Sequence, residues 1–277
     1  GVFYPKGLAQ KNELSYASRI FDSIEINGTF YSLQRPELFG EWDAATPDDF
    51  IFALKGPRFI THMKRLKDVR TPLANFFASG PLRLGKKLGP ILWQFPPDFK
   101  FDARRIGAFL AMLPRDTEAA SALAKRHNDK IKGRAWLKID RARPLRYAME
   151  IRHESFRSVE FIALLREHNV ALACADSVEW PLLMDVTADF VYCRLHGSEV
   201  LYASGYDDDA LGTWARRAIA WTSGGEPDDA QRVINSPGPK RAKRDVFVYF
   251  DNDAKVRAPK DAQTLRAKLA YLGAAGS

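Results

Sequence analysis

The sequence has few cysteines and no long apolar segment, and these two absences exclude several classes of protein. Cys174 and Cys193 are the two cysteines among 277 residues, and each lies inside an apolar run. A disulfide framework or a zinc site needs more cysteines at characteristic spacings, so we interpret both as reduced core residues. No segment approaches the roughly 20 apolar residues that cross a bilayer. We therefore predict a cytoplasmic protein without a membrane partner.

Short cofactor and catalytic motifs are absent as well. The sequence contains no GxGxxG, P-loop, HExxH, CxxC or GxSxG. The missing phosphate-binding loops argue against an open doubly wound sheet, in which such a loop follows a strand. The chemistry must therefore be sought in the arrangement of single polar residues.

The charge balance is basic. Lys and Arg number 42 against 34 Asp and Glu, which gives a net charge of +8. Such a balance favours anionic partners and speeds encounter with them. A small anionic substrate is the partner that we expect first, and nucleic acid is the alternative. An ordinary solvated surface explains the same charge.

Short β-rich runs alternate with helical stretches along the chain. The expected strands are 23–27, 50–55, 90–95, 147–152, 170–176, 190–196 and 245–250. The expected helices are 36–45, 103–113, 159–168, 207–222 and 262–272. This alternation predicts parallel strands joined by crossover helices. A chain near ~250 residues then favours a TIM-barrel-like (β/α) barrel, formed as a single domain over 1–277.

Two segments interrupt the alternation. Residues 116–143 are highly charged, and residues 223–244 are rich in Gly, Pro, Asp, Lys and Arg. We predict that both are surface insertions. The second ends in the basic run 240–244, for which a solvated loop and a phosphate contact are the two interpretations.

Polar residues gather where the predicted strands end. They are Glu25, Asn27, Lys55, Gln94, Glu150, Arg152, His153, Asp176, Arg194, His196, Asp251, Asn252 and Asp253. In a parallel barrel these ends meet at one face, which is where barrel enzymes build their sites. We therefore predict a polar pocket at this face.

Several chemistries fit this set of residues. Glu25 and Glu150 are a candidate acid/base pair, as in glycoside hydrolysis. A divalent metal is the candidate cofactor. Its candidate ligands are Glu25, Glu150, Asp176, His196, His153 and His62. The candidates for binding an anionic group are Lys55, Arg58, Arg152 and Arg194.

A purely structural interpretation uses the same residues. Three acids, Glu25, Glu150 and Asp176, match three bases in number, so that a layer of salt bridges would satisfy them all. The three bases are Lys55, Arg152 and Arg194. If a site is present instead, we expect at least one of Glu25→Gln and Glu150→Gln to change stability little while ligand binding falls.

The strand-end segments together resemble the DUF72 family, also called YecE-like proteins. The resemblance lies in residues 1–5, 21–31, 52–62, 88–97, 150–153, 189–197 and 248–253. It implies a TIM-barrel-like fold, and it implies no activity, because the family is named for lacking one. Members of this family usually begin with a strand rich in Gly, Thr, Ser and Trp. That strand is absent before Gly1, so we expect a barrel without its first strand.

The sequence leads to one hypothesis with two alternatives. We predict an enzyme that performs acid/base or metal-assisted hydrolysis on an anionic, phosphate-bearing substrate. Its catalytic candidates are Glu25, Glu150, His196 and Asp176, and its substrate-binding candidates are Asn27, Lys55, Arg58, Gln94, Arg152, Arg194 and Asn252. A carbohydrate hydrolase would use the same carboxylates, with Trp93 or Tyr31 as a stacking platform. A non-catalytic nucleic-acid-binding protein would use the basic loops.

Overall fold

The computed structural model describes residues 3–197, 201, 204–252 and 256–275 of the protein. The chain divides into two compact units, which we treat separately. The first unit is Leu8–Ala148, and the second unit is Gly1–Gly7 together with Met149–Ser277. The single-domain assignment made from the sequence stays a prediction. Gly1, Val2 and Asp253 of the family segments lie outside the described residues.

The first unit contains three parallel strands in sequential order. They are β1 (Ser23–Ile26), β2 (Ile51–Lys55) and β3 (Leu88–Gln94). Ser23 is aligned with Ile51 and Lys55 with Leu92, so the polar strand ends of this unit lie at the same edge. This register places Lys55 and Gln94 at neighbouring strand ends, as predicted.

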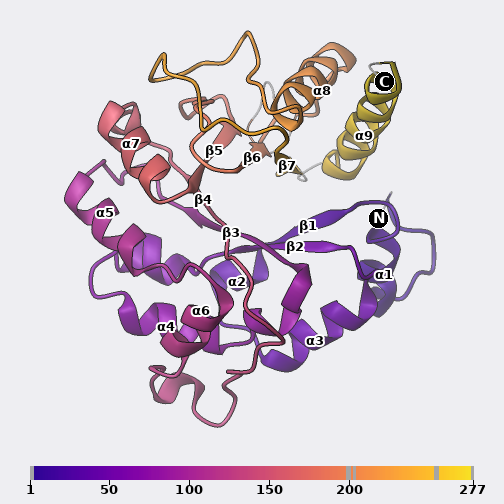
Figure 1. Ribbon diagram of the computed structural model, residues 1–277. Helices are drawn as coiled ribbons and strands as arrows, with labels where there is room; N and C mark the ends of the chain where they lie inside the picture. Colours follow the sequence, from indigo (N-terminus) through magenta and orange to yellow (C-terminus); the bar gives the residue numbers. More distant parts are fainter. Residues whose placement is uncertain (1–2, 198–200, 202–203, 253–255, 276–277) are drawn as a thin grey trace. The chain divides into compact units, whose positions relative to one another are not determined.

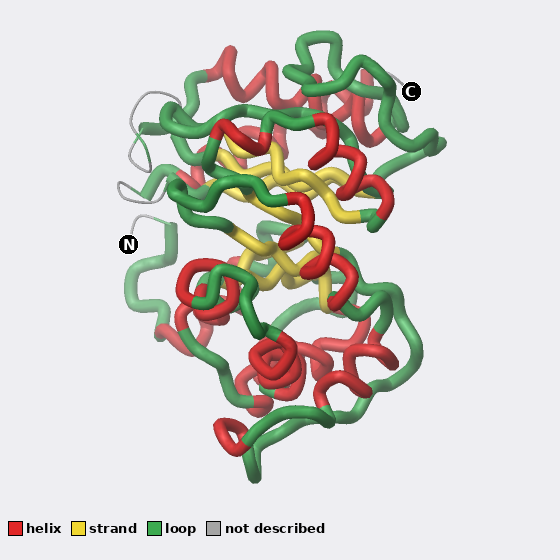
Figure 2. Tube along the Cα trace, turned by 90° about the vertical axis from the view of Figure 1, so that its left-hand side faces the viewer, coloured by secondary structure: helices red, strands yellow, loops and turns green. Residues whose placement is uncertain are grey.

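Helices of the first unit pack around these strands (Figures 1 and 2). They are α1 (Glu13–Ala17), α2 (Gly28–Tyr31), α3 (Pro36–Ala45), α4 (Arg70–Ala78), α5 (Ala103–Met112) and α6 (Thr117–Ala124). Short helical turns are η1 (Gln10–Asn12), η2 (Phe59–Met63), η3 (Pro81–Lys87) and η4 (Asp129–Ile131). α3 begins with a proline at its first turn, and Asp102 caps α5 by accepting from the Arg105 amide. Both are standard helix-start signals.

The charged segment 116–143 is partly packed. Asp116 caps α6, and the helix buries Thr117, Ala120, Ser121 and Ala124. The Ser121 hydroxyl also donates to the Leu137 carbonyl at 2.7 Å. The segment therefore contributes a helix to the first unit, although its sequence is dominated by charge.

The second unit is built on parallel strands as well. β4 (Tyr147–Glu150) spans the boundary between the units, and it is followed by β5 (Val170–Asp176), β6 (Phe190–Leu195) and β7 (Asp245–Phe250). β5, β6 and β7 pair in that order, with Cys174 aligned to Cys193 and Leu195 aligned to Phe250. The helices are α7 (Val159–Glu167), α8 (Asp208–Thr222) and α9 (Ala258–Ala275), with the turn η5 (Glu154–Phe156). In Figure 1, α8 and α9 lie side by side.

An apolar core joins these strands to α8 and α9. Cys193, Leu195 and Trp214 are among its buried members, and both cysteines are free thiols. The cysteines are therefore core residues, as the sequence predicted. Hydrogen bonding to Cys193 and burial together raise the pKa of the Cys174 thiol well above its ordinary range, which disfavours the reactive thiolate.

The segment 223–244 forms no helix or strand among its residues, but it is anchored to the second unit. The buried Asp185 carboxylate accepts from the amides of Val233 and Ile234 at 2.8 and 3.1 Å. Arg244 is 5% exposed and donates to the Gly225 and Pro239 carbonyls. One cation of the basic run 240–244 is thus used to hold the loop itself.

All seven predicted strands form, with ends within two residues of the prediction. The helices α1, α2, α4 and α6 were not predicted. α1 and α2 are too short to show a period. α4 is buried continuously from Leu73 to Ala78, so it lacks the alternation of apolar and polar faces on which helix prediction depends.

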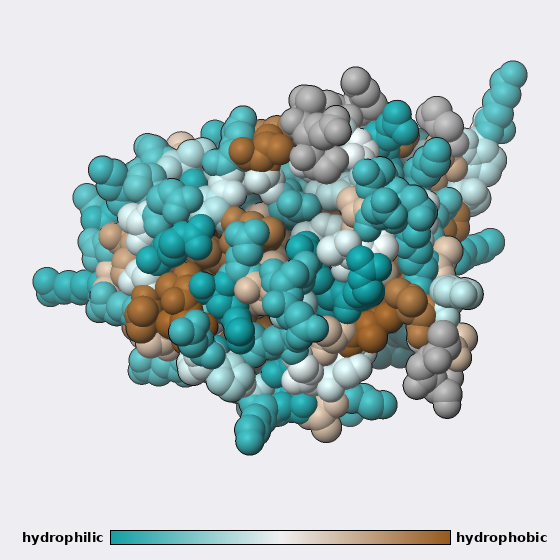
Figure 3. All heavy atoms as spheres, turned by 90° about the horizontal axis from the view of Figure 1, so that it is seen from above, coloured by the Kyte–Doolittle hydropathy of each residue, from teal (hydrophilic) through white to brown (hydrophobic). Residues whose placement is uncertain are grey.

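None of the helices in the described part of the chain is long and apolar enough to cross a membrane. The face shown in Figure 3 is mostly hydrophilic, with small apolar areas between polar side chains.

Candidate functional site

A cluster of charged side chains lies at the carboxyl ends of the strands of the second unit. Glu150 ends β4, Arg194 lies near the end of β6, and His196 and Asp251 directly follow β6 and β7. Arg152 follows Glu150 by two residues, so that the two can share one face of an extended chain. We call these five residues the Glu150 cluster.

Glu150 is held by two arginines. Its Oε2 atom is 2.6 Å from Arg194 Nη1, and its Oε1 atom is 2.8 Å from Arg152 Nε. The side chains of Glu150 and Arg194 have no exposed surface, whereas that of Arg152 is 10% exposed. A buried carboxylate needs such compensation, because its desolvation is otherwise very costly.

His196 and Asp251 extend this pairing. His196 Nδ1 lies 3.2 Å from Asp251 Oδ2, and its Nε2 lies 3.6 Å from Glu150 Oε2. Arg194 Nη2 also donates to Asp251 Oδ2 at 2.9 Å. His196 is fully buried, while the Asp251 side chain is 23% exposed. The buried members therefore connect two partly exposed ones, Arg152 and Asp251.

The protonation of the cluster follows from these contacts. Burial alone would raise the pKa of Glu150, but Arg194, Arg152 and His196 together lower it well below its ordinary value. Burial likewise opposes a charged His196, but the nearby carboxylates of Asp251 and Glu150 outweigh it and raise the pKa of the imidazole. With His196 protonated, the cluster carries three positive and two negative charges.

Trp180 covers part of the cluster. The Arg152 guanidinium lies 3.7 Å from the centre of the Trp180 ring, and the ring meets His196 edge-on at 5.1 Å between centroids. A guanidinium held over an indole face is stabilised by cation–π attraction. Trp180 therefore fixes the orientation of the partly exposed cation.

Asp176 and Asn252 belong to a second group of contacts. Asp176 accepts from the Trp214 indole at 3.1 Å. Burial and the nearby Asp176 carboxylate raise the pKa of the Tyr206 hydroxyl. Asn252 is fully buried and donates to Asp261 at 2.9 Å, while its Oδ1 atom finds no partner within the described residues. These contacts hold Asp176 at the end of β5 and Asn252 directly after β7.

The remaining candidates lie in the first unit. Glu25 is half-buried in β1, Asn27 is exposed, and the buried Lys55 holds its ammonium 4.4 Å from the Phe30 ring centre. The exposed Arg58 lies 5.9 Å over the Tyr31 ring. Gln94 is 6% exposed, and its Oε1 atom has no hydrogen-bond partner among the described residues.

The structure thus brings together Glu150, Arg152, Arg194 and His196 of the predicted set. The convergence of the first-unit candidates upon them stays a prediction.

Within the described residues, no three His, Cys, Asp or Glu side chains are grouped so that they could hold a metal ion. His62 instead packs edge-on against Phe30, and His153 accepts from the Ser155 amide.

The proposal of Trp93 as a sugar-stacking platform is wrong. Trp93 is fully buried and packs against Phe76 and Phe109 at ring distances of 6.0 and 5.1 Å. It belongs to the core because alternation in β3 turns it away from the polar strand-end residue that follows it. Tyr31, in contrast, is 67% exposed.

Several residues of these networks were not predicted as site residues. Asp251 was recognised at a strand end but was given no role, although its position beside Asn252 was the available signal. Trp180, Tyr206 and Asp261 come from loops and from α9, and no sequence pattern links them to the strand ends. Only the folded chain places them there.

The shifted pKa values of Glu150 and His196 make the free energy of unfolding depend on pH. Glu150 has a lowered folded pKa, so its contribution is complete above its ordinary value of 4.5 and is lost as pH falls through the folded value. His196 has a raised folded pKa, so its contribution is complete below its ordinary value of 6.5 and is lost as pH rises through the folded value. Both contributions are therefore complete between pH 4.5 and 6.5.

We expect denaturant titrations at several pH values to show stability falling on both sides of this window. The variant His196→Gln should remove the decrease on the alkaline side and keep the decrease on the acid side. An unchanged alkaline slope in His196→Gln would show that another group causes it.

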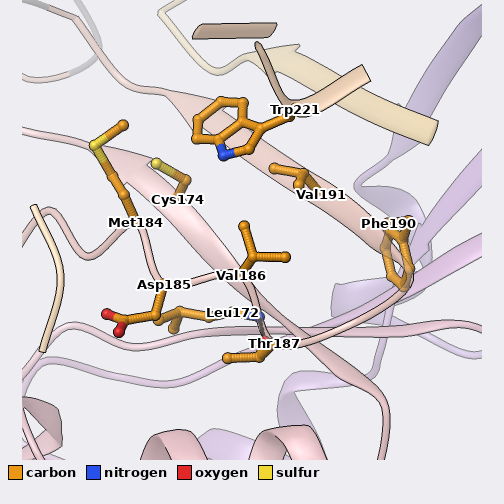
Figure 4. Close-up of a pocket in the computed structure, with 9 residues that line it drawn as sticks. All are labelled: Leu172, Cys174, Met184, Asp185, Val186, Thr187, Phe190, Val191 and Trp221. Carbon is orange, nitrogen blue, oxygen red and sulfur yellow. Dashed lines mark hydrogen bonds between the residues drawn. The ribbon is translucent and has the colours of Figure 1, made fainter. Parts of the chain in front are cut away.

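A small cavity in the same unit is not a substrate site. It measures about 10 Å³ and lies among Cys174, Met184 and Trp221 (Figure 4). Such a volume admits about one water molecule.

Comparison with known proteins matches this chain to one protein family. The model of a family described as "Protein of unknown function DUF72" matches residues 1–275. Over 102 residues the chain is 32% identical to the UPF0759 protein YecE of Escherichia coli (strain K12), a match that covers 30% of this chain and 38% of that protein. The UPF0759 protein YunF of Bacillus subtilis (strain 168) is 29% identical over 103 residues, covering 35% and 36%. The chain thus spans little more than a third of these curated relatives.

Solved structures support the fold. A DUF72 family protein from Thermotoga maritima superposes with a TM-score of 0.69 at 24% identity, over 98% of this chain and 94% of that one. A DUF72 family protein from Enterococcus faecalis V583 gives 0.68 at 18% identity, over 96% and 90%. These likenesses confirm the TIM-barrel-like α/β fold predicted from the sequence.

Proposed function

The chain belongs to the DUF72 family, and for this member we propose that the Glu150 cluster is an active site that hydrolyses a small anionic substrate by acid–base chemistry. The observation that carries the proposal is the difference in exposure within the cluster. Glu150, Arg194 and His196 are fully buried, whereas the side chains of Arg152 and Asp251 are 10% and 23% exposed. The buried side chains therefore hold one cation, Arg152, and one carboxylate, Asp251, where a substrate in solvent can reach them.

Each partly exposed residue has a role in this proposal. Arg152, fixed by Glu150 and Trp180, would bind the negative group of the substrate, for which the planar guanidinium is well suited. Asp251 would accept a proton from the attacking water, a contribution typically worth ~10²–10⁴ in rate. Arg194 and His196 act as positioning residues, because they contact Asp251 and are shielded from solvent.

The alternatives have less support. A glycosidase needs two carboxylates that face the sugar, but both oxygens of Glu150 are bound by arginines and Trp93 is buried. Nucleic-acid binding by the basic run 240–244 has one cation fewer at its disposal, because Arg244 donates to carbonyl groups of its own loop. A purely structural salt-bridge network would make the same contacts, and comparing site variants with surface variants distinguishes it from an active site.

The test compares two site variants with two matched surface variants. Asp251→Asn and Arg152→Gln each remove one charge from the cluster. Asp229→Asn and Arg157→Gln remove one exposed charge each, from ion pairs with Arg217 and Glu154 in which the changed side chains are 49% and 44% exposed. All four proteins and the parent are assayed by phosphorus and proton NMR against phosphomonoesters, phosphodiesters and carboxylate esters.

We expect Asp251→Asn to lower kcat about a hundredfold and Arg152→Gln to act mainly by raising KM. The two surface variants should match the parent. If the parent turns over no compound, or if both site variants remain as active as the surface variants, the catalytic role is refuted and the network is structural.

A further inference from the structure

A cavity of about 480 Å³ lies within the first unit and shares no lining residue with the Glu150 cluster. Its wall comes from α2 and the residues after it, the loop after β2 with η2, α4 as far as Asn75, and the turn η4 with the residue before it. All lining residues fall between 30 and 130, so the cavity belongs to one unit. Its volume is in the range of small-molecule sites, ~300–1,000 Å³.

The lining combines an apolar wall with two cations. Phe30, Tyr31 and Phe59 supply aromatic surface, and Lys64 and Lys130 supply positive charge. Neither lysine forms an ion pair with a carboxylate of the described residues. Lys130 Nζ instead lies 5.1 Å over the Phe59 ring. Unneutralised ammonium groups beside aromatic rings suit a ligand that is both flat and anionic.

Side-chain hydrogen bonds hold this arrangement in place. Asn75 is 4% exposed, donates to Asn128 Oδ1 at 3.0 Å and accepts from the Asn128 amide at 3.0 Å. Asn128 Oδ1 also accepts from the Lys130 amide at 3.1 Å. The turn that carries Lys130 is therefore fixed to α4. A preformed wall binds a ligand with less loss of conformational entropy.

The backbone on the other side of the cavity has an unusual conformation. η2 is a single π-helical turn over Phe59–Met63, and Arg65, Leu66 and Asp68 then adopt φ values of 49°, 65° and 49°. Left-handed conformations are costly for residues other than glycine and cluster at ligand sites. π-helical turns are likewise frequent at functional sites.

We infer that this cavity binds a small molecule made of a planar aromatic ring that bears a negatively charged group. The ring lies against Tyr31 and Phe59, and the anionic group meets Lys64 and Lys130. Asp68 at the rim limits the affinity for anions. Arg58, whose guanidinium lies 5.9 Å from the centre of the Tyr31 ring, adds positive charge beside this aromatic wall. The inference does not depend on the proposed hydrolase activity.

The binding experiment uses pairs of probes that differ only in charge. Indole-3-acetate is compared with indole-3-ethanol, and adenosine 5′-monophosphate with adenosine, by ligand-observed NMR and calorimetry on the full chain. Inorganic phosphate is a third probe, which shows whether negative charge alone is enough for binding when no aromatic ring is present. We expect at least one anionic member to bind about tenfold more tightly than its neutral counterpart. The two pairs distinguish a carboxylate from a phosphate as the anionic group.

Variants then test each part of the wall. Lys64→Gln combined with Lys130→Gln should weaken the anionic probe about fivefold or more and leave the neutral one unchanged. Tyr31→Ala should weaken both. Asp68→Asn should strengthen the anionic probe, and asparagine tolerates the left-handed conformation there. Lys67→Gln and Tyr271→Ala are the matched controls, because both residues are exposed and neither lines the cavity.

Three results would overturn the inference. The first is that no ring-containing probe binds at millimolar concentration. The second is equal affinity for the charged and neutral members of both pairs. The third is a lysine double variant that still binds the anion as the parent does. Tyr31 and Lys130 are exposed and Lys64 is partly exposed. We therefore expect the circular dichroism of these variants to match that of the parent, so that loss of binding is not loss of folding.

Discussion

We expect Glu150→Gln to lower the free energy of unfolding by about 3–5 kcal/mol, the usual cost of removing one member of a buried ion pair. The substitution keeps the size of the side chain but removes its charge. Arg194, which has no exposed surface, then loses the partner at 2.6 Å, and Arg152 and His196 lose the same anion. Urea unfolding followed by circular dichroism at pH 6 measures the change.

Two further variants separate charge from shape. Glu154→Gln removes a carboxylate four residues away whose partner, Arg157, is 44% exposed, and it should change stability by less than about 0.5 kcal/mol. The double variant Glu150→Gln with Arg194→Met should be more stable than the sum of the single effects predicts, because the two side chains are in contact. A Glu150→Gln protein as stable as the parent would show that Arg194 is neutralised elsewhere.

This expectation refines what was inferred from the sequence. There, a small stability change was expected for at least one of Glu25→Gln and Glu150→Gln. The contacts of Glu150 now assign the large stability effect to that residue. For Glu25 the small effect stays a prediction.

The second large effect is expected for Gly56→Ala. Gly56 follows β2, and a Cβ atom added there would lie 2.3 Å from carbons of the Trp93 ring. That ring cannot move freely, because it has no exposed surface and packs against Phe76 and Phe109. Overpacking of this kind costs ~1–3 kcal/mol and occasionally more. We expect the upper part of that range in thermal and urea unfolding.

The matched control is Gly28→Ala, since its added Cβ would meet only the Gln34 side chain at an ordinary 3.6 Å. Replacing Trp93 by Phe together with Gly56→Ala should recover part of the lost stability, because the smaller ring leaves room for the methyl group. If Gly56→Ala unfolds at the same urea concentration as the parent, the ring and the strand end can separate at little cost.

Local sequence patterns determined the strands and their order of appearance. Short apolar runs bounded by polar residues predicted every strand, and apolar residues at helical spacing, Leu38, Phe39 and Trp42, predicted the helix that is now α3. These features depend on neighbours along the chain, which is why they can be read without coordinates. The polar residues at the strand ends were found for the same reason.

The roles of those polar residues were decided by tertiary structure. Glu25 and Glu150 look alike in sequence, yet Glu150 is fully buried between two arginines while Glu25 is half-buried in β1. Exposure and pairing depend on which residues from distant segments pack around a side chain, and no local pattern contains that information.

The aromatic residues make the same point. Trp93 and Tyr31 were equal candidates for a ligand platform, but one is enclosed by the core and the other is 67% exposed at the rim of a cavity. That cavity joins residues from 30 to 130, and its two lysines are 66 positions apart (130 minus 64). Only folding brings such residues together, because packing of α2, η2, α4 and η4 creates the space between them.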